Sequence, residues 1–145
     1  SLSDPFCVER NHQDFNVMIR SRVDLLFCNQ EEAFTMMETQ VTQEALEGLS
    51  ENVETVVMTL GNRGSLIINQ GQIFYIDPIV VEVVDTTGAG DAYAAGFLYG
   101  FSHDQSIMNC GRIASVMAGT VIEQIGPRIE TASMKTLKER LSKIP

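Results

Sequence analysis

The sequence predicts an α/β protein with a mostly parallel sheet and an antiparallel hairpin at one edge of it. Short apolar runs rich in β-branched residues alternate with segments of helical pattern, as in proteins built from parallel strands and crossover helices. Two alternating segments flank Gln70-Gly71, a pair typical of a tight hairpin turn. The 145 residues, of which 44% are hydrophobic, suffice for one domain with its own core.

The first half begins with helix signals and continues with a short buried strand. Asp4 and the proline after it are typical of a helix start, so we expect a helix over residues 5–20. Residues 23–29, VDLLFCN, form a short apolar run suited to a buried strand. Two short helices are expected next, at residues 30–39 and 42–49.

The second half opens with strands and closes with helices. Residues 55–61, TVVMTLG, predict a buried strand that ends at a glycine. The expected hairpin strands are 65–69 and 72–76, and IVVEVV over residues 79–84 predicts one more strand. Helices are expected at residues 91–101, 104–125 and 132–142, the last carrying two leucines four positions apart.

The predicted strands end in polar or glycine residues, namely Asn29, Gly61 and Asp85. In parallel α/β sheets, ligands bind beyond the carboxyl ends of the strands. We therefore expect the three loops that follow these residues to face one crevice.

Composition excludes several classes of function. A formal net charge of −9 argues against a nucleic-acid partner or an anionic membrane surface. The three cysteines are far apart and form no CxxC pair, which favours reduced thiols in a cytoplasmic protein over disulfides or a zinc site. No apolar run approaches the length of a membrane span, so we expect a soluble protein.

The stretch DTTGAGD, residues 85–91, is the strongest signal for chemistry in the chain. A P-loop would need a lysine after its glycines, and none follows within reach. The dinucleotide fingerprint would place Gly or Ala at position 93, where Tyr93 stands. Both familiar glycine loops for nucleotides are therefore excluded by the residues present.

What remains is a tight turn that leads into a helix with an acid at its start. The amide groups of residues 88–91 would be helix N-terminal donors, and together with the helix dipole they could hold an anion. Asp91 could then accept a proton from a hydroxyl that attacks a phosphoryl group held there. The structural alternative is that Asp91 is simply an aspartate at a helix start, a position that favours this residue.

The stretch DTTGAGDAYAAGF closely resembles the C-terminal signature of the ribokinase-like (PfkB) family of sugar and nucleoside kinases. Two further features occur in the family's order: NQEEA, which resembles its N-x-x-E motif, and VVMTLGNRGSLI, which resembles the strand and turn that line the nucleotide. The resemblance runs from about residue 3 to the end and includes IGPR after the long helix. SDPFCVER, AAGFLYG and CGRIAS look most similar to bacterial adenosine-kinase-like sugar kinases.

The resemblance implies an ATP-dependent kinase of three-layer α/β/α fold. Asp91 would be the general base, and Gly88, Ala89 and Gly90 would supply the anion hole. The other implied ligand-binding residues are Asn29 and Glu32 for Mg²⁺ and its waters, Thr59, Gly61 and Gly64 for the ribose and phosphates of ATP, Cys110, Ala114 and Met117 for the adenine, and Asp85 and Thr87 for a monovalent cation such as K⁺.

Two of these groups have structural alternatives. Asn29 and Glu32 also fit a strand end followed by a helix cap with an acidic first turn. The small residues of 104–125, among them Ala114, also fit close packing of two helices. Both alternatives stay open at the level of sequence.

The acceptor pocket is the main part of such a kinase that the sequence does not contain. The chain has no initiator methionine, and its start reads like the end of a strand that enters a helix. We therefore expect residues 1–145 to be the C-terminal nucleotide-binding and catalytic part of a longer protein. Members of the family are about twice as long as this chain.

Two functional hypotheses follow. The first is that the chain is part of a kinase for a small sugar or nucleoside. That kinase could form a homodimer through an N-terminal lid that this chain lacks. The second is a nucleotide-binding fragment without turnover by itself.

Overall fold

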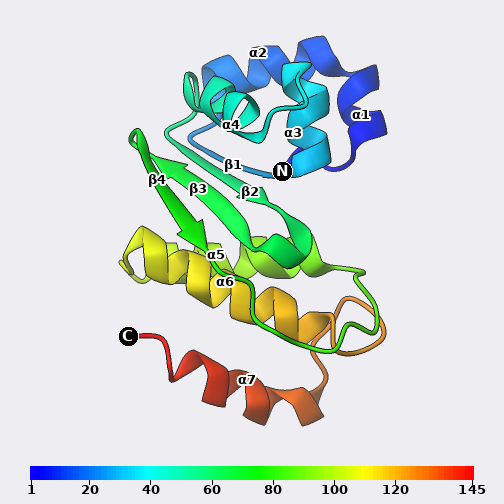
Figure 1. Cartoon of the computed structure of the whole chain (residues 1–145), viewed down its shortest axis with the longest axis vertical. Coiled ribbons are helices and arrows are strands. Elements are labelled where there is room, and N and C mark those ends of the chain that lie inside the picture. Colours follow the sequence, from blue (N-terminus) through cyan, green and yellow to red (C-terminus); the bar gives the residue numbers. More distant parts are fainter. The chain divides into compact units, whose positions relative to one another are not determined.

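The computed structural model describes residues 1–145, and the chain divides into two compact units. The first unit consists of Ser1–Gly61 with Ser65–Tyr75, and the second of Asn62–Gly64 with Ile76–Pro145. Figure 1 labels the helices and strands of both units.

The first unit is a mixed sheet covered by helices, which Figure 1 shows on one side of the strands. The sheet has four strands in the order β1-β2-β3-β4. Strands β1 and β2 pair in parallel, whereas β2 and β3 pair antiparallel. The elements are α1 (Pro5–Arg10), α2 (His12–Arg22), β1 (Leu25–Asn29), α3 (Gln30–Met37), α4 (Thr42–Ser50), β2 (Thr55–Thr59), β3 (Ser65–Asn69) and β4 (Gln72–Ile76).

The predicted α/β class and the edge hairpin are confirmed. Gln70 and Gly71 both have positive φ, 47° and 78°, as the favoured two-residue hairpin turn requires. The apolar positions of α3, α4, β1 and β2 join one core, and its members include Leu26, Leu46 and Val56. The burial of this core is the main force that holds the helices onto the strands.

The single helix expected over residues 5–20 is wrong, because Asn11 separates two helices. Asn11 ends α1 and caps α2, with φ −121° and ψ 26°. Both its backbone N–H and its side-chain Nδ2 donate to the Cys7 carbonyl oxygen, over 3.1 and 2.9 Å. A side chain that competes for backbone acceptors in this way favours a helix end over a helix interior.

The second unit consists of helices. It contains α5 (Ala89–Ser102), α6 (Ile107–Val121), a 3₁₀ turn (Thr131–Ser133) and α7 (Met134–Leu141). Helices α5 and α6 approach closely at Gly96, where an added Cβ would lie only 2.8 Å from the Cα of Ala114. Arg140 of α7 donates to the Glu123 carboxylate from both of its terminal nitrogens, which fastens α7 near the end of α6.

The strand expected over residues 79–84 is also wrong, because this segment has no strand partner. Instead, the backbone at the end of this segment bonds to the C-terminal end of α6. The N–H groups of Val84 and Asp85 both donate to the Ile122 carbonyl, over 2.8 and 3.2 Å. Val80 and Val83 are exposed. Consequently Asp85 does not follow a strand end as we expected, and it owes its position to the segment after α6.

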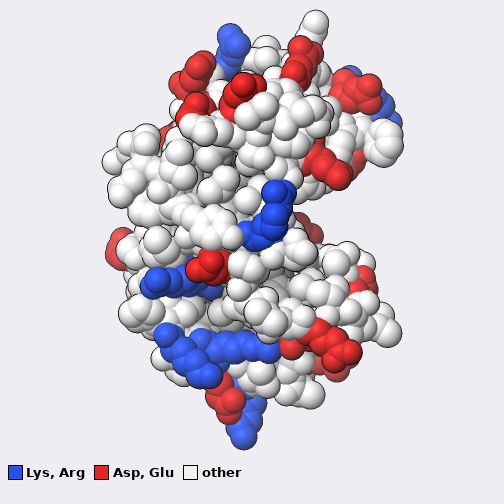
Figure 2. Space-filling view, viewed as in Figure 1, with Lys and Arg blue, Asp and Glu red and all other residues white.

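Charged side chains are unevenly distributed over the surface. Figure 2 shows lysine and arginine gathered over α7, whose sequence MKTLKERL carries three basic residues. No helix combines the length and the apolar character that crossing a membrane would need.

Candidate functional site

In the first unit, the predicted residues Asn29 and Thr59 lie side by side at the ends of two strands. The register pairs Asn29 of β1 with Thr59 of β2, and Thr59 with Ser65 of β3. The Thr59 hydroxyl donates to the Cys28 carbonyl over 3.5 Å. Parallel pairing of β1 and β2 therefore brings two of the candidate ligand residues to one edge of the sheet.

Asn29 and Glu32 form a reciprocal cap at the start of α3. The Glu32 N–H donates to Asn29 Oδ1 over 2.8 Å, and the Asn29 N–H donates to Glu32 Oε2 over 2.9 Å. In addition, Asn29 Nδ2 donates to Glu32 Oε1 over 2.8 Å. Burial raises the pKa of the Glu32 carboxyl, against the opposing effect of the Asn29 N–H.

This capping box is the structural alternative that the sequence left open, and it accounts for both residues locally. Both carboxylate oxygens of Glu32 already accept from Asn29, and the side chain is buried. The chain offers no group of three or more His, Cys, Asp or Glu side chains that could hold a metal ion. The cap explains both residues without a metal ion, and their role with Mg²⁺ and its waters, as the resemblance implies, stays a prediction.

Gly61 and Gly64 have different surroundings. Gly61 belongs to the first unit, is exposed, and has open space where a Cβ would stand. Gly64 belongs to the second unit, where an added Cβ would lie 2.1 Å from the Ile76 carbonyl oxygen. With a φ of 85°, this position requires glycine for backbone packing, whatever its relation to a nucleotide.

In the second unit, Asp85 joins two loops. Its Oδ2 accepts from the Gly126 N–H over 2.9 Å. Its Oδ1 accepts from both the N–H and the hydroxyl of Thr87, over 2.9 and 2.7 Å. The Gly126 N–H, followed by the Thr87 hydroxyl and N–H, lowers the pKa of the Asp85 carboxyl.

These bonds bear on the predicted monovalent cation. Each carboxylate oxygen of Asp85 has a donor, and the Thr87 hydroxyl donates to one of them. The side chains of Asp85 and Thr87 thus satisfy each other without a cation. The hydrogen bonds explain both residues locally, and a role of theirs in binding K⁺ stays a prediction.

The turn that Asp85 holds leads directly into α5. Gly88 is the N-cap, with φ 79°, and an added Cβ there would lie 2.5 Å from Cβ of Pro127. Contrary to expectation, the Ala89 N–H is engaged, since it donates to the Thr86 carbonyl over 3.1 Å. The N–H groups of Gly90 and Asp91 precede the first hydrogen bonds of the helical ladder, as at any helix start.

Asp91 is exposed on the first turn of α5, a helix of 14 residues. Neither an ion pair nor a hydrogen bond within the chain engages its carboxylate. An accessible carboxylate next to two free helix amides can take a proton while the amides hold an anion. The sequence predicted the amides of residues 88–91 in this role; the Ala89 amide is engaged elsewhere, and the role of the others stays a prediction.

The predicted adenine-contacting residues lie in the contact between α5 and α6. Cys110 and Ala114 are buried, and they lie opposite Gly100 and Gly96. Met117 is half-buried, with its Cγ 2.9 Å from where a Cβ of Gly96 would be. Close helix packing, the alternative stated above, therefore explains Cys110 and Ala114, while a nucleotide role of these residues stays a prediction.

Sequence reasoning gave no role to the loop that follows α6. Gly126 and Pro127 of this loop contact Asp85 and Gly88, and they fix the turn before α5. A Gly-Pro pair after a helix signals a chain turn, but it does not reveal what the turn will touch.

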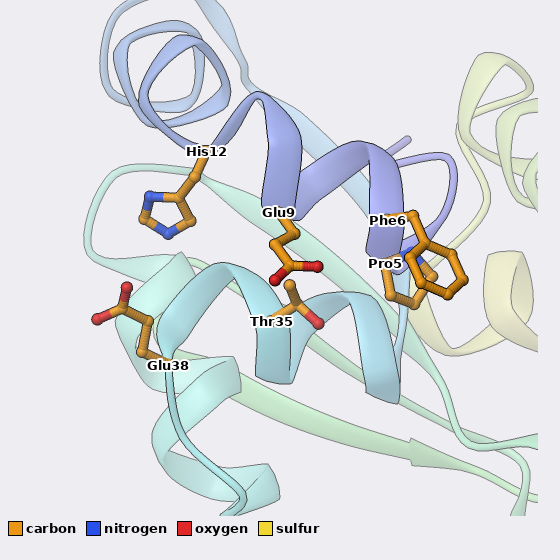
Figure 3. Close-up of a pocket in the computed structure, with 6 residues that line it drawn as sticks. All are labelled: Pro5, Phe6, Glu9, His12, Thr35 and Glu38. Atoms are coloured by element: carbon orange, nitrogen blue, oxygen red, sulfur yellow. The ribbon is translucent and has the colours of Figure 1, made fainter.

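One cavity of about 410 Å³ lies elsewhere in the first unit (Figure 3). Its lining comes from α1, the start of α2 and α3: Pro5, Phe6, Glu9, His12, Thr35 and Glu38. His12 Nε2 is already paired with the Met36 carbonyl over 2.9 Å. No predicted site residue lines this cavity, so we do not assign the chemistry to it.

Comparison with known proteins gives a consistent result. The family model described as pfkB family carbohydrate kinase matches residues 2–133. Two solved structures, a probable sugar kinase from Rhizobium etli and an adenosine kinase from Sinorhizobium meliloti, each share 39% sequence identity with the chain and superpose with a TM-score of 0.90. Each covers 95% of this chain, and this chain covers 42% and 43% of them, respectively.

A nucleoside kinase from Methanothermobacter thermautotrophicus is 34% identical over 122 residues. That alignment covers 79% of this chain and 38% of the relative. The chain thus spans less than half the length of these three relatives.

Proposed function

Because the chain belongs to the pfkB family of carbohydrate kinases, we propose that it carries the phosphoryl-transfer end of an ATP-dependent kinase. The acceptor would be a hydroxyl of a small sugar or nucleoside. In this proposal residues 1–145 are the nucleotide-binding and catalytic part of the enzyme, and the acceptor pocket is completed by other residues of the whole protein.

The observation that supports this proposal most directly is the start of α5. The exposed carboxylate of Asp91 stands next to the unpaired amides of Gly90 and Asp91, at the positive end of a 14-residue helix. An anionic ligand would gain from the amides, whereas a plain anion-binding site would not place a carboxylate beside them. A site for phosphoryl transfer from ATP to a hydroxyl uses both features.

The reaction would proceed by in-line displacement. The acceptor hydroxyl oxygen forms a bond to the γ-phosphorus, and the bond from that phosphorus to the β,γ-bridging oxygen breaks, which releases ADP. Asp91 accepts the proton of the hydroxyl, and the amides of Gly90 and Asp91 stabilise the charge on the transferred phosphoryl oxygens. Positioning by the turn that Asp85 and Gly88 form would supply much of the rate.

The residues of the first unit would serve the nucleotide and its ion. Thr59 and Gly61, at the end of β2, would border the ribose and phosphates of ATP. When bound, Mg²⁺ would neutralise charge on the phosphate oxygens. Asn29 and Glu32 would orient waters of its coordination shell, since each Glu32 carboxylate oxygen that accepts from Asn29 keeps capacity for a further donor.

The names of the relatives narrow the acceptor only to a class. They include an adenosine kinase, a nucleoside kinase and a probable sugar kinase. We therefore propose a hydroxyl on a ribose-like ring, either free or within a nucleoside. The cytoplasm, where ATP is abundant, is the proposed location.

The test is an ADP-release assay with protein from the full reading frame. Acceptors would be adenosine, cytidine, ribose, fructose and 2-keto-3-deoxygluconate, each with ATP and Mg²⁺. We expect turnover with one acceptor class and none without an acceptor. ATP binding without ADP release for any acceptor would favour the second hypothesis, a nucleotide-binding protein without turnover.

A further inference from the structure

In the segment between α6 and the 3₁₀ turn, residues 122–130, the side chain of Gln124 closes the loop formed by residues 125–130. Its Oε1 accepts from the Glu130 N–H over 3.2 Å and from the Ser133 hydroxyl over 3.1 Å. Its Nε2 donates to the Arg128 carbonyl. Three bonds from one half-buried amide thus tie the end of this loop to its beginning.

The loop that Gln124 closes contacts the turn before α5 at two places. Gly126, with φ 87°, donates its N–H to Asp85 Oδ2 over 2.9 Å. Pro127 stands against Gly88, so closely that a Cβ on Gly88 would lie 2.5 Å from that of Pro127. Residues 126 and 127 therefore contact the Gly88 turn, and they lie within the loop that the Gln124 amide closes.

We propose that Gln124 is a positioning residue for phosphoryl transfer, which acts through Gly126 and Pro127 on the turn that orients Asp91 and the amides beside it. This inference rests on the proposed kinase function. A displacement of about 1 Å at a reacting group can cost about 100-fold in rate. A loosened loop should therefore lower kcat while it leaves the residues that would bind ATP in the first unit untouched.

Three variants test this. Gln124→Leu removes all three hydrogen bonds at similar volume. Gln124→Glu keeps an acceptor for Glu130 and Ser133 but loses the donor to Arg128. Gln105→Leu is the matched control, because the side chain of Gln105 is exposed at the other end of α6 and only its backbone is hydrogen-bonded.

The first measurement is amide hydrogen exchange of the full-length protein by NMR, which does not depend on activity. We expect the Gly126 N–H to exchange about tenfold faster or more in Gln124→Leu, since it loses the support of its loop. Amides in the middle of α5 and α6 should keep their protection, which shows that the variant is folded. An unchanged exchange rate of the Gly126 N–H would overturn the proposal that Gln124 holds this loop in place.

The second measurement is steady-state kinetics of the same variants in the full-length protein. We expect kcat to fall about tenfold or more in Gln124→Leu, with KM for ATP changed less than about threefold. The kcat of Gln124→Glu should lie between those of Gln124→Leu and the wild type. The kcat of Gln105→Leu should equal that of the wild type. A normal kcat together with fast Gly126 exchange would overturn the positioning role, whereas a wild-type protein without any phosphoryl transfer would overturn the proposed function itself.

Discussion

The Gly126 N–H donates to Oδ2 of Asp85 over 2.9 Å, and this bond joins two loops that are 41 positions apart in the sequence. It makes the turn before α5 part of the segment that follows α6. Asp85 also accepts from Thr87. One carboxylate therefore holds both the turn before α5 and the loop after α6.

The first prediction concerns the pH dependence of this carboxylate. The pKa of Asp85 is lowered in the folded chain, chiefly by the Gly126 N–H. Its contribution to stability is therefore fully present above the ordinary aspartate pKa, and it is lost as the pH falls through the depressed folded value. We expect the Gly126 amide resonance to titrate with that depressed pKa in an acid titration followed by NMR.

The control for this prediction is Asp85→Asn. This variant cannot ionise, so the acid titration of the Gly126 resonance should disappear. If the Gly126 resonance still titrated in Asp85→Asn, another group would be responsible and the assignment to Asp85 would be wrong.

The second prediction is that Gly88→Ala destabilises the chain. The φ of 79° costs an alanine about 1–2 kcal/mol, and the contact with Pro127 adds about 1–3 kcal/mol of overpacking. We expect the free energy of unfolding in urea to fall by about 2–5 kcal/mol.

Gly90→Ala is the matched comparison for stability. An added Cβ at Gly90 has nothing within 4 Å, and alanine is the better helix former. The free energy of unfolding of Gly90→Ala should therefore equal or exceed that of the wild type. Equal destabilisation by the two alanines would mean that Pro127 does not confine Gly88.

Local signals account for what the sequence predicted correctly. The hairpin at Gln70-Gly71 and the cap at Asn29 are encoded within a few residues of themselves, so their chemistry can be read directly. The glycine turn and Asp91 also belong to one short stretch, whereas the roles that this stretch suggested for them stay predictions.

The errors have the opposite origin, since they depend on contacts far along the chain. The β-branched residues 79–84 resemble a strand, but a strand needs a partner, and the N–H groups of Val84 and Asp85 bond to Ile122 instead. The same holds for the loop around Gly126. No local pattern indicates that this glycine will meet Asp85, because the two residues are 41 positions apart in the sequence.

The third prediction concerns the attachment of α7. Arg140 makes a bidentate pair with Glu123 and also donates to the Thr120 hydroxyl, and the side chains of the pair are 24% and 32% exposed. We expect Arg140→Met to lower the free energy of unfolding by about 1–2 kcal/mol, because it breaks several charge-assisted bonds at once.

Lys135→Met is the matched control on the same helix. Lys135 pairs with Glu139 at 3.9 Å, and both side chains are largely exposed, at 88% and 61%. Such a surface pair contributes about 0–0.5 kcal/mol. If urea unfolding gave similar losses for both variants, the Arg140 pair would be no more than another surface contact.

The last prediction concerns the proposed base. Asp91→Asn keeps the size of the side chain and the first-turn amides of α5, but it removes the proton acceptor. We expect kcat of the full-length kinase to fall about 100-fold to 10,000-fold, while the Kd for ATP measured by calorimetry changes little. Near-normal turnover would show that Asp91 is only the helix-start aspartate that the sequence also allowed. A loss of ATP affinity as large as the loss of kcat would instead place Asp91 in nucleotide binding, because removal of a base should leave the ground-state complex intact.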